Sequence, residues 1–349
     1  MADVESLINR HIREMEPYSS ARDEFEGNAD VFLDANESWY SGECDANRYP
    51  DPRCRDLRKL LESTMNLPFD MTAIGNGSDE VIDLLMRMFC REGDSVMVST
   101  PTYGEYRVFA STNNLRTIDV SLKESLELDA DGIIAALGRE NPKIVFICTP
   151  NNPTGRVYPL SDVRRIADAN SGITVVDEAY SDFAEGFESA VSLIAGNPRV
   201  VVMRTLSKSW GLAGARVGIL VADPVIQRTF VKMKPPYNVS LLNQRAAIRV
   251  LSEPERYRDV VSQVIADRKI MERKAAEYPF VREVIPSEAN FIVIRTDDAD
   301  RLYRYLLSKG IIVRNRTKER YLSGCLRITI GSKEENRRLM EALDGYEAC

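Results

Sequence analysis

The chain has 349 residues, of which 44% are hydrophobic and 28% are charged, a composition typical of a folded globular protein of about two domains. The 46 Lys and Arg residues against 53 Asp and Glu residues give a net charge of −7, so the chain lacks the basic excess that nucleic-acid binding requires. The single histidine, His11, excludes histidine-based metal sites and most Ser-His or Cys-His catalytic designs. We therefore expect no metal, no nucleic acid, and an exposed His11.

The six cysteines form no C-x-x-C pair, which favours free thiols in a reducing cytosol. The residues up to Arg13 carry charges of both signs and no apolar stretch of a signal peptide. The apolar runs of the chain have the length of strands, not of membrane spans. These features predict a cytoplasmic protein that is not exported and does not cross a membrane.

The chain begins with a predicted arm, residues 1–30. A short helix is expected from Leu7 to Arg13, followed by Pro17 and a polar, turn-rich stretch. We expect this arm to pack with the small domain described below.

Residues 31–236 form the predicted large domain, in which apolar runs of strand length alternate with helical segments. The predicted strands are Ser95–Ser99, Leu115–Val120, Ile144–Cys148, Ile173–Val176, Val200–Met203 and Val217–Val221, and helices are expected at Asp79–Phe89 and Leu160–Ala169. Continuous apolar strands that alternate with helices predict an α/β fold with a mostly parallel sheet covered by helices on both faces.

Residues 237–349 form a predicted smaller α+β domain. After Lys234-Pro235-Pro236 the sequence has long, charged segments with helical periodicity. Helices are expected at about Leu241–Glu277 and at Asp300–Lys309, and strands at Val281–Ile285, Phe291–Arg295, Ile311–Arg314 and Cys325–Ile330.

Polar residues follow three of the predicted strands, at the edge of a parallel sheet where ligands bind. Asn152, Asp177 and Lys208 each come shortly after an apolar run. A Gly-rich segment, Gly75 to Glu80, opens a helix whose free N–H groups suit a phosphate. Arg216, eight residues after the lysine, can bring a guanidinium to the same place. An amine nucleophile, a carboxylate, an amide and a phosphate cradle are the groups that pyridoxal 5′-phosphate needs.

The strings Asn152-Pro153-Thr154-Gly155, Asp177-Glu178-Ala179-Tyr180 and Ser207-Lys208, with Arg216 beyond them, resemble the fold-type I pyridoxal-phosphate-dependent aminotransferases. The resemblance covers nearly the whole chain. The segments Asn47 to Asp51 and Leu326 to Gly331 resemble the branch of that family that acts on histidinol phosphate.

This resemblance implies roles for the residues that match the family motifs. Lys208 is similar to the lysine that holds the cofactor covalently and moves a proton during the reaction. Asp177 would pair with the ring nitrogen, Asn152 and Tyr180 would bind the ring oxygen, and Tyr103 would stack on the ring. The implied catalytic residues are Lys208, Asp177 and Tyr180.

The resemblance also implies two groups of binding residues. The residues expected around the cofactor phosphate are Gly77, Ser78, Asp79, Thr205, Ser207, Arg216 and, from a neighbouring subunit, Tyr49. Those expected to bind substrate are Arg327, Arg314, Tyr18 and Asn152. The chain departs from the family pattern at Ile219, where an aromatic residue is more usual, and we expect this change to affect only packing.

Taken singly, these residues have simpler interpretations. Lys208 could be a surface lysine, Asp177 a helix cap, Gly75 to Ser78 a turn, and the arginines solvated salt-bridge partners. Their joint occurrence in a fixed order favours the site.

The resemblance implies a homodimeric enzyme that transfers an amino group between histidinol phosphate and 2-oxoglutarate, giving glutamate. This reaction belongs to histidine biosynthesis. An aromatic aminotransferase and a threonine-phosphate decarboxylase of the same fold group remain alternatives. A non-catalytic effector-binding module is disfavoured because no DNA-binding segment accompanies the fold. A dinucleotide-binding dehydrogenase is disfavoured because no G-x-G-x-x-G follows the first strand.

Overall fold

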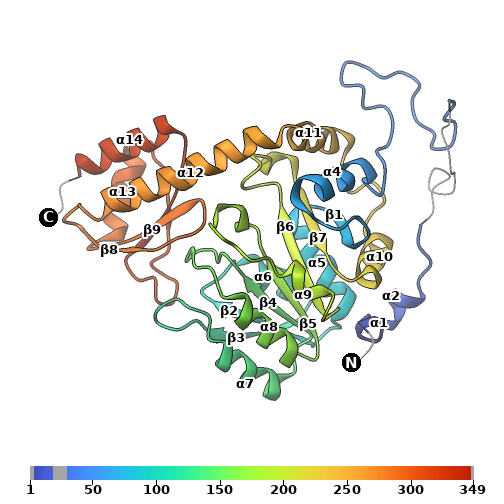
Figure 1. Ribbon diagram of the computed structural model, residues 1–349, viewed down its shortest axis with the longest axis horizontal. Coiled ribbons are helices and arrows are strands. Elements are labelled where there is room, and N and C mark those ends of the chain that lie inside the picture. Colours follow the sequence, from blue (N-terminus) through green and yellow to red (C-terminus); the bar gives the residue numbers. More distant parts are fainter. Residues whose placement is uncertain (1–3, 19–29, 347–349) are drawn as a thin grey trace.

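The computed structural model describes residues 4–18 and 30–346. Figure 1 shows a large sheet in the middle of the molecule, a smaller sheet with its own helices at one end, and the N-terminal helices at the other. The long helix α12 (Pro254–Ala275) runs between the two sheets.

The large sheet has, among the described residues, the strand order β1-β7-β6-β5-β4-β2-β3. Its strands are β1 (Thr72–Asn76), β2 (Ser95–Thr100), β3 (Arg116–Ser121), β4 (Ile144–Cys148), β5 (Ile173–Asp177), β6 (Val200–Thr205) and β7 (Val217–Val221). Strands β2 to β6 pair in parallel, and β7 pairs antiparallel with β6 and β1. The prediction of a mostly parallel sheet is confirmed, and all six predicted large-domain strands are present; β1 was not predicted.

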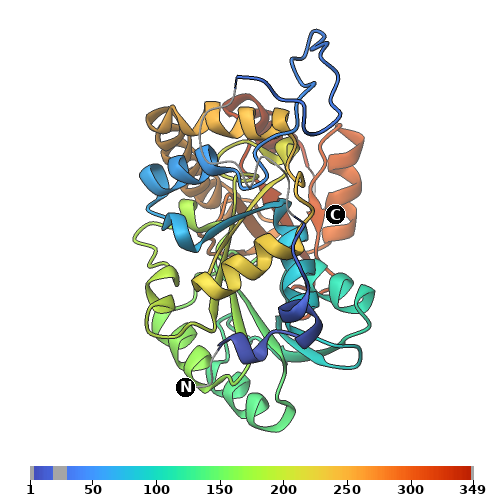
Figure 2. The same ribbon diagram turned by 90° about the vertical axis from the view of Figure 1, so that its right-hand side faces the viewer.

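Helices cover both faces of the large sheet, because alternate side chains of its buried strands point to opposite faces. In β4, Val145 and Ile147 belong to one core and Ile144 and Phe146 to the other. The first core receives α4 (Arg55–Met65), α7 (Ala130–Glu140), α8 (Leu160–Ala169), α9 (Val191–Ile194) and α11 (Leu241–Leu251). The second receives α1 (Val4–Leu7), α2 (Arg10–Glu14), α5 (Gly77–Phe89), α6 (Glu105–Thr112) and α10 (Pro224–Met233), and Figure 2 shows α10 and the N-terminal helices on that face. Short 3-10 turns lie at Phe69–Met71, Ser181–Phe183 and Ala213–Ala215.

The smaller sheet is antiparallel, with the order β10-β11-β9-β8 in the described part of the chain. Its strands are β8 (Val281–Ile285), β9 (Phe291–Thr296), β10 (Arg314–Asn315) and β11 (Cys325–Thr329). Helices α12, α13 (Ala299–Ser308) and α14 (Lys333–Asp344) pack on it around Ile294 and Leu326. Of the strand expected at Ile311–Arg314, only Arg314 lies in a strand, because β10 spans Arg314–Asn315. The single helix expected at Leu241–Glu277 is divided, because Pro254 starts a new helix after Ser252 and Glu253.

The described part of the N-terminal arm packs differently from the prediction. Val4, Ile8 and Ile12 are buried in the second core of the large domain rather than against the small domain. The amide of Asn9 binds the carbonyls of Arg87 and Cys90 at the end of α5, which anchors the arm there. Residues 19–29 of the predicted arm lie outside the described residues. At the other predicted boundary, residue 236, the structure shows that α11 still packs in the large-domain core.

The structure also bears on the cysteines, on His11 and on the expectation that no helix crosses a membrane. Cys44, Cys54, Cys90, Cys148 and Cys325 are free thiols, and Cys349 lies outside the described residues. His11 is exposed on α2, as predicted. Within residues 4–18 and 30–346, no helix has the length and apolar character needed to cross a bilayer.

Candidate active site

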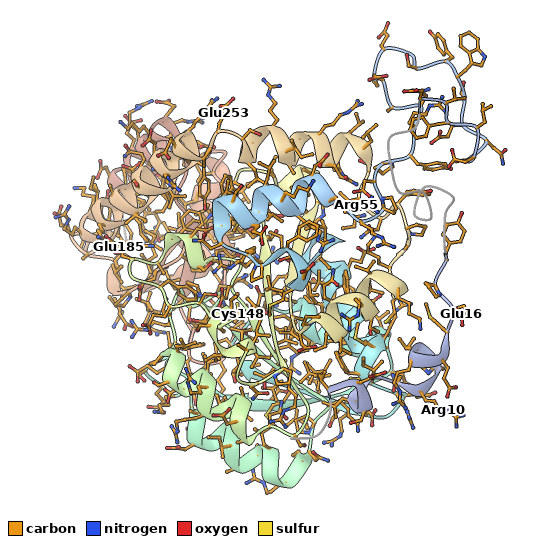
Figure 3. The ribbon with its side chains drawn as sticks, turned by 45° about the vertical axis from the view of Figure 1, so that its right-hand side comes forward. Arg10, Glu16, Arg55, Cys148, Glu185 and Glu253 are labelled. Carbon is orange, nitrogen blue, oxygen red and sulfur yellow. The ribbon has the colours of Figure 1, made fainter. Side chains whose placement is uncertain are left out.

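The site lies where three neighbouring parallel strands end at the same level. Cys148 at the end of β4 pairs with Asp177 at the end of β5, and Asp177 pairs with Met203 on β6. Cys148, labelled in Figure 3, lies in the interior of the large domain. This register places the segments that follow the three strands beside one another, around one pocket. The pocket is lined by Ser78, Asp79, Tyr103, Cys148, Asn152, Asp177, Ala179, Tyr180, Thr205, Ser207, Lys208, Ala213 and Arg216.

Asp177 is the buried carboxylate of this pocket, with 4% of its surface exposed. Its Oδ2 accepts a hydrogen bond of 2.6 Å from the hydroxyl of Tyr106, and its Oδ1 accepts one of 3.1 Å from the backbone N–H of Ala179. Burial raises the pKa of Asp177, while these hydrogen bonds and Lys208 act in the opposite direction. Asp177 is therefore a fixed carboxylate whose charge a nearby cation would stabilise.

Lys208 follows β6 and presents its amine to the same pocket. Its Nζ lies 5.6 Å from the centre of the Tyr180 ring. Burial lowers the pKa of Lys208, and the positive charges of Arg327 and Arg216 lower it further. A lysine with a lowered pKa has more of the neutral amine that acts as a nucleophile and a base.

The phosphate cradle is built by close backbone packing at the start of α5. Gly77 has φ +79°, and a Cβ at this position would overlap with Nη2 of Arg216. A Cβ at Gly218 on β7 would overlap with the backbone of Gly77, so both glycines allow α5 to begin against β7. The N–H groups of the first turn of α5 and the Arg216 guanidinium thus lie together, which suits an anion.

Side chains around the cradle hold one another in place. Arg216 Nη2 donates to Asp79 Oδ2 at 2.8 Å, and the Tyr103 hydroxyl donates to Asp79 Oδ1 at 3.3 Å. The hydroxyls of Thr205 and Ser207 are hydrogen-bonded at 2.9 Å.

Arg327 reaches the pocket from the small sheet. Its Nη1 donates to Oδ1 of Asn152, and its guanidinium lies 5.2 Å from the centre of the Phe291 ring. Burial lowers the pKa of Arg327, and the neighbouring charge of Arg316 lowers it further. Burial also raises the pKa of Tyr180, so its hydroxyl keeps its proton at neutral pH and can donate a hydrogen bond. An arginine partly removed from water beside the pocket can bind a carboxylate or a phosphate with two parallel hydrogen bonds.

Most of the residues implied by the sequence meet at this pocket, including Lys208, Asp177, Asn152, Tyr180, Tyr103 and Arg216. In the described part of the chain, the predicted residues that do not line the pocket are Gly77, Arg327, Tyr49, Tyr18 and Arg314. Gly77 directly precedes the lining residue Ser78, and Arg327 is hydrogen-bonded to the lining residue Asn152. Tyr49 is half exposed and stacks on Tyr237 with ring centres 4.3 Å apart. Tyr18 is exposed and lines a separate surface groove with Pro52 and Arg228. Arg314 is exposed on β10, directly opposite Arg327 in the antiparallel ladder.

Sequence reasoning missed Tyr106, Cys148 and Ala179 as residues of the site. Tyr106 is fully buried behind Asp177 and lies three residues after Tyr103. Tyr103 lies just before α6 and Tyr106 lies in its first turn, and this closeness in sequence was the available signal. Ala179 contributes a backbone N–H, which leaves no trace in side-chain identity.

The residues of the pocket fit pyridoxal 5′-phosphate. The cradle that a Cβ at Gly77 would fill provides a place for a phosphate, and the buried Asp177 provides an anion for a protonated ring nitrogen. Lys208 provides the amine to which the cofactor's aldehyde would attach. Together these groups match the phosphate, the ring nitrogen and the aldehyde of the cofactor.

The parallel sheet, the second antiparallel sheet and this donor set define a pyridoxal-phosphate-type transferase. The family model described as "Aminotransferase class I and II" matches residues 32–343, and the chain belongs to this family.

Individual relatives and solved structures show which members of the family the chain is similar to. The chain is 42% identical over 348 residues to the histidinol-phosphate aminotransferase of Cytophaga hutchinsonii, covering 98% of this chain and 99% of the relative. It is 41% identical over 344 residues to the protein of the same name from Parabacteroides distasonis, covering 98% and 99%. Among solved structures, it is similar to histidinol-phosphate aminotransferase from Sinorhizobium meliloti in complex with pyridoxal-5'-phosphate. The TM-score is 0.80 and the identity 27%, over 87% of this chain and 84% of that chain.

Proposed function

We propose that this protein is a pyridoxal-phosphate-dependent enzyme that transfers the amino group of L-histidinol phosphate to 2-oxoglutarate. The products are imidazole acetol phosphate and L-glutamate, and the step belongs to L-histidine biosynthesis. The observation that carries the proposal is the meeting of Lys208, Asp177 and Arg216 in one pocket that Arg327 borders through Asn152. The full-length relatives at 41% and 42% identity support the choice of substrate.

The cofactor would supply an aldehyde for the amine and a ring that draws electrons from the substrate's reacting carbon. Asp177 Oδ atoms would hold the proton of the ring nitrogen, and Asn152 and Tyr180 would bind the ring oxygen. Tyr103 would pack against the ring, while Gly77, Ser78, Asp79, Thr205, Ser207 and Arg216 would hold the phosphate. Lys208 Nζ would accept the proton from the reacting carbon of the substrate and return it to C4′ of the cofactor. Its lowered pKa leaves the amine available as a base.

Both substrates carry an anionic group that would bind at Arg327 and Arg314. Histidinol phosphate carries a phosphate ester where glutamate carries its α-carboxylate, so Arg327 can bind either group by paired hydrogen bonds. Arg314 lies opposite Arg327 on the neighbouring strand, and we propose that it adds a second charge for the phosphate. We also propose Tyr18 as a further contact to that phosphate.

We propose that the enzyme is a cytoplasmic homodimer. Residues 30–49 extend away from the body of the molecule in Figure 1, and Val31, Leu33 and Trp39 are 71%, 91% and 86% exposed. Large apolar side chains that are exposed together favour a protein interface. A second copy would cover them, and Tyr49 from this segment would then complete the partner's phosphate site. Mixing inactive Lys208→Ala and Tyr49→Phe chains tests this sharing, since one intact site per mixed dimer restores partial activity; fully active Tyr49→Phe would contradict it.

The decisive experiment compares turnover of histidinol phosphate, phenylalanine and threonine phosphate with the purified protein. Preferred transamination of histidinol phosphate is expected. Preference for phenylalanine would indicate an aromatic aminotransferase, and release of carbon dioxide from threonine phosphate would indicate the decarboxylase alternative.

A further inference from the structure

Tyr106 makes a buried side-chain hydrogen bond to the proposed site and is not itself a residue that lines the pocket. It lies on α6 and is fully buried, and its hydroxyl donates to Asp177 Oδ2 at 2.6 Å. Its ring stacks on Phe146 of β4 with centres 4.7 Å apart and lies edge-on to Tyr103 at 5.5 Å. The hydroxyl is therefore held at one point behind the carboxylate by packing on two sides.

The hydroxyl of Tyr106 can act toward Asp177 in one direction only. Burial and the neighbouring Asp177 raise the pKa of Tyr106 well above its usual value, so the phenol keeps its proton and donates it. A hydrogen bond donated to a carboxylate stabilises the ionised form over the protonated one. Without this bond, Oδ2 would be a buried charged atom with one donor fewer, which favours uptake of a proton.

We propose that Tyr106 is a positioning residue that keeps the Asp177 carboxylate ionised and fixed, so that the proton they would share stays on the ring nitrogen of bound pyridoxal phosphate. The inference rests on the proposed function, and it assigns Tyr106 a role through Asp177 rather than on the substrate. In its absence, one proton moves from the ring nitrogen to Asp177, with no other change in the atoms of the site.

Other ionisable groups also face Asp177 and set the background for this effect. They are Cys148 on β4, Glu178 next in the chain, Tyr180 three residues on, Tyr103 before α6 and Lys208 after β6. Of the favourable influences on the ionised form of Asp177, the bond from Tyr106 ranks ahead of the Ala179 N–H and of Lys208. A single hydroxyl deletion on α6 is therefore expected to be felt at the carboxylate.

The test is the Tyr106→Phe variant, which removes the hydroxyl and keeps the ring between Phe146 and Tyr103. The matched control is Tyr158→Phe, because Tyr158 is also buried and its hydroxyl has no hydrogen-bond partner among the described residues. Both variants are loaded with pyridoxal phosphate that carries ¹⁵N in its ring, and the ring-nitrogen resonance distinguishes the protonated from the neutral form. Thermal unfolding of each variant checks that the fold is kept.

We expect a protonated ring nitrogen in the wild type and in Tyr158→Phe, and a neutral one in Tyr106→Phe. We also expect the dissociation constant for the cofactor to rise in Tyr106→Phe, because a protonated Asp177 no longer offers a negative charge to the ring nitrogen. If Tyr106→Phe does not fold, 3-fluorotyrosine at position 106 replaces it as the test. Its more acidic hydroxyl stabilises the free carboxylate more strongly, so the pair of Asp177 and the ring nitrogen should release its proton at lower pH than in the wild type.

An unchanged resonance in Tyr106→Phe, or a fluorinated protein that releases the nitrogen proton at the same pH as the wild type, overturns the inference and leaves the proposed function intact. A wild type that binds no pyridoxal phosphate overturns the proposed function and this inference with it. The two failures are therefore distinguishable from the wild-type spectrum alone.

Discussion

Arg327 on β11 donates a hydrogen bond to Oδ1 of Asn152, which follows β4, and this bond joins the small antiparallel sheet to the edge of the large parallel one. The residue proposed to bind the substrate's anion therefore holds a residue proposed to bind the cofactor. If both roles hold, substrate binding and cofactor binding would be coupled through this pair.

The Lys208→Ala variant should lose both covalent attachment of the cofactor and transamination, because Lys208 supplies the amine of the pocket. Borohydride reduction followed by peptide mass analysis should locate the adduct on Lys208 in the wild type. Lys269→Ala is the control, since Lys269 forms an exposed ion pair with Glu185. An adduct on another lysine would contradict the assignment.

The Asp177→Asn variant should retain some cofactor but transaminate about 10² to 10³ times more slowly, because a neutral amide cannot hold the ring-nitrogen proton. Stopped-flow single-turnover rates measure the effect apart from substrate binding. Near-normal rates would show that Asp177 acts only as a structural carboxylate that binds the N–H of Ala179.

The Gly77→Ala variant should bind the cofactor more weakly, because the added Cβ overlaps with Arg216 Nη2 and displaces the guanidinium. Gly186→Ala is the matched control: Gly186 also has positive φ, +70°, but among the described residues nothing lies within 4 Å of its Cβ position. Backbone strain is thus common to both variants, and only Gly77→Ala disturbs the cradle. Equal cofactor affinity for the two, measured by equilibrium dialysis, would place the phosphate elsewhere.

Substitution of Arg327 and substitution of Arg314 should affect the two half-reactions differently. Arg327→Leu should slow the reactions with histidinol phosphate and with glutamate by about 10²-fold or more, because Arg327 is partly desolvated and would bind both anions. Arg314→Leu should slow the reaction with histidinol phosphate more than that with glutamate, since Arg314 is exposed and would add charge for a dianion. Equal losses on both substrates for Arg314→Leu would point to a general aminotransferase.

The attachment of the cofactor to the cofactor-free protein should quicken as pH rises, because Lys208 reacts as the neutral amine. Arg327 lowers the pKa of Lys208, so removing its positive charge in Arg327→Leu raises that pKa. The rise in rate should therefore move to higher pH in Arg327→Leu. Arg282→Leu, at an exposed ion pair with Asp297, is the control and should leave the profile in place. An unchanged pH profile in Arg327→Leu would show that Arg327 does not influence the amine of Lys208.

The strands and the polar residues that end them were predictable because a buried parallel strand shows as a continuous apolar run. Strand β1 was missed because Thr72–Asn76 contains a glycine and an asparagine and pairs only at the sheet edge. Tyr106 was missed because a buried tyrosine reads as a packing residue until its hydroxyl is seen on Asp177. The roles proposed for Tyr18 and Tyr49 rest on the resemblance, since both are exposed in a single chain.

The common register of β4, β5 and β6 restricts how the length of this chain can change. Because side chains alternate along a strand, one residue inserted between Ile173 and Asp177 would turn Asp177 to the opposite face of the sheet, away from Tyr106 and Lys208. Insertions in the loops before these strands leave that alternation untouched. Functional variants of different length should therefore differ in those loops and keep the strand lengths constant.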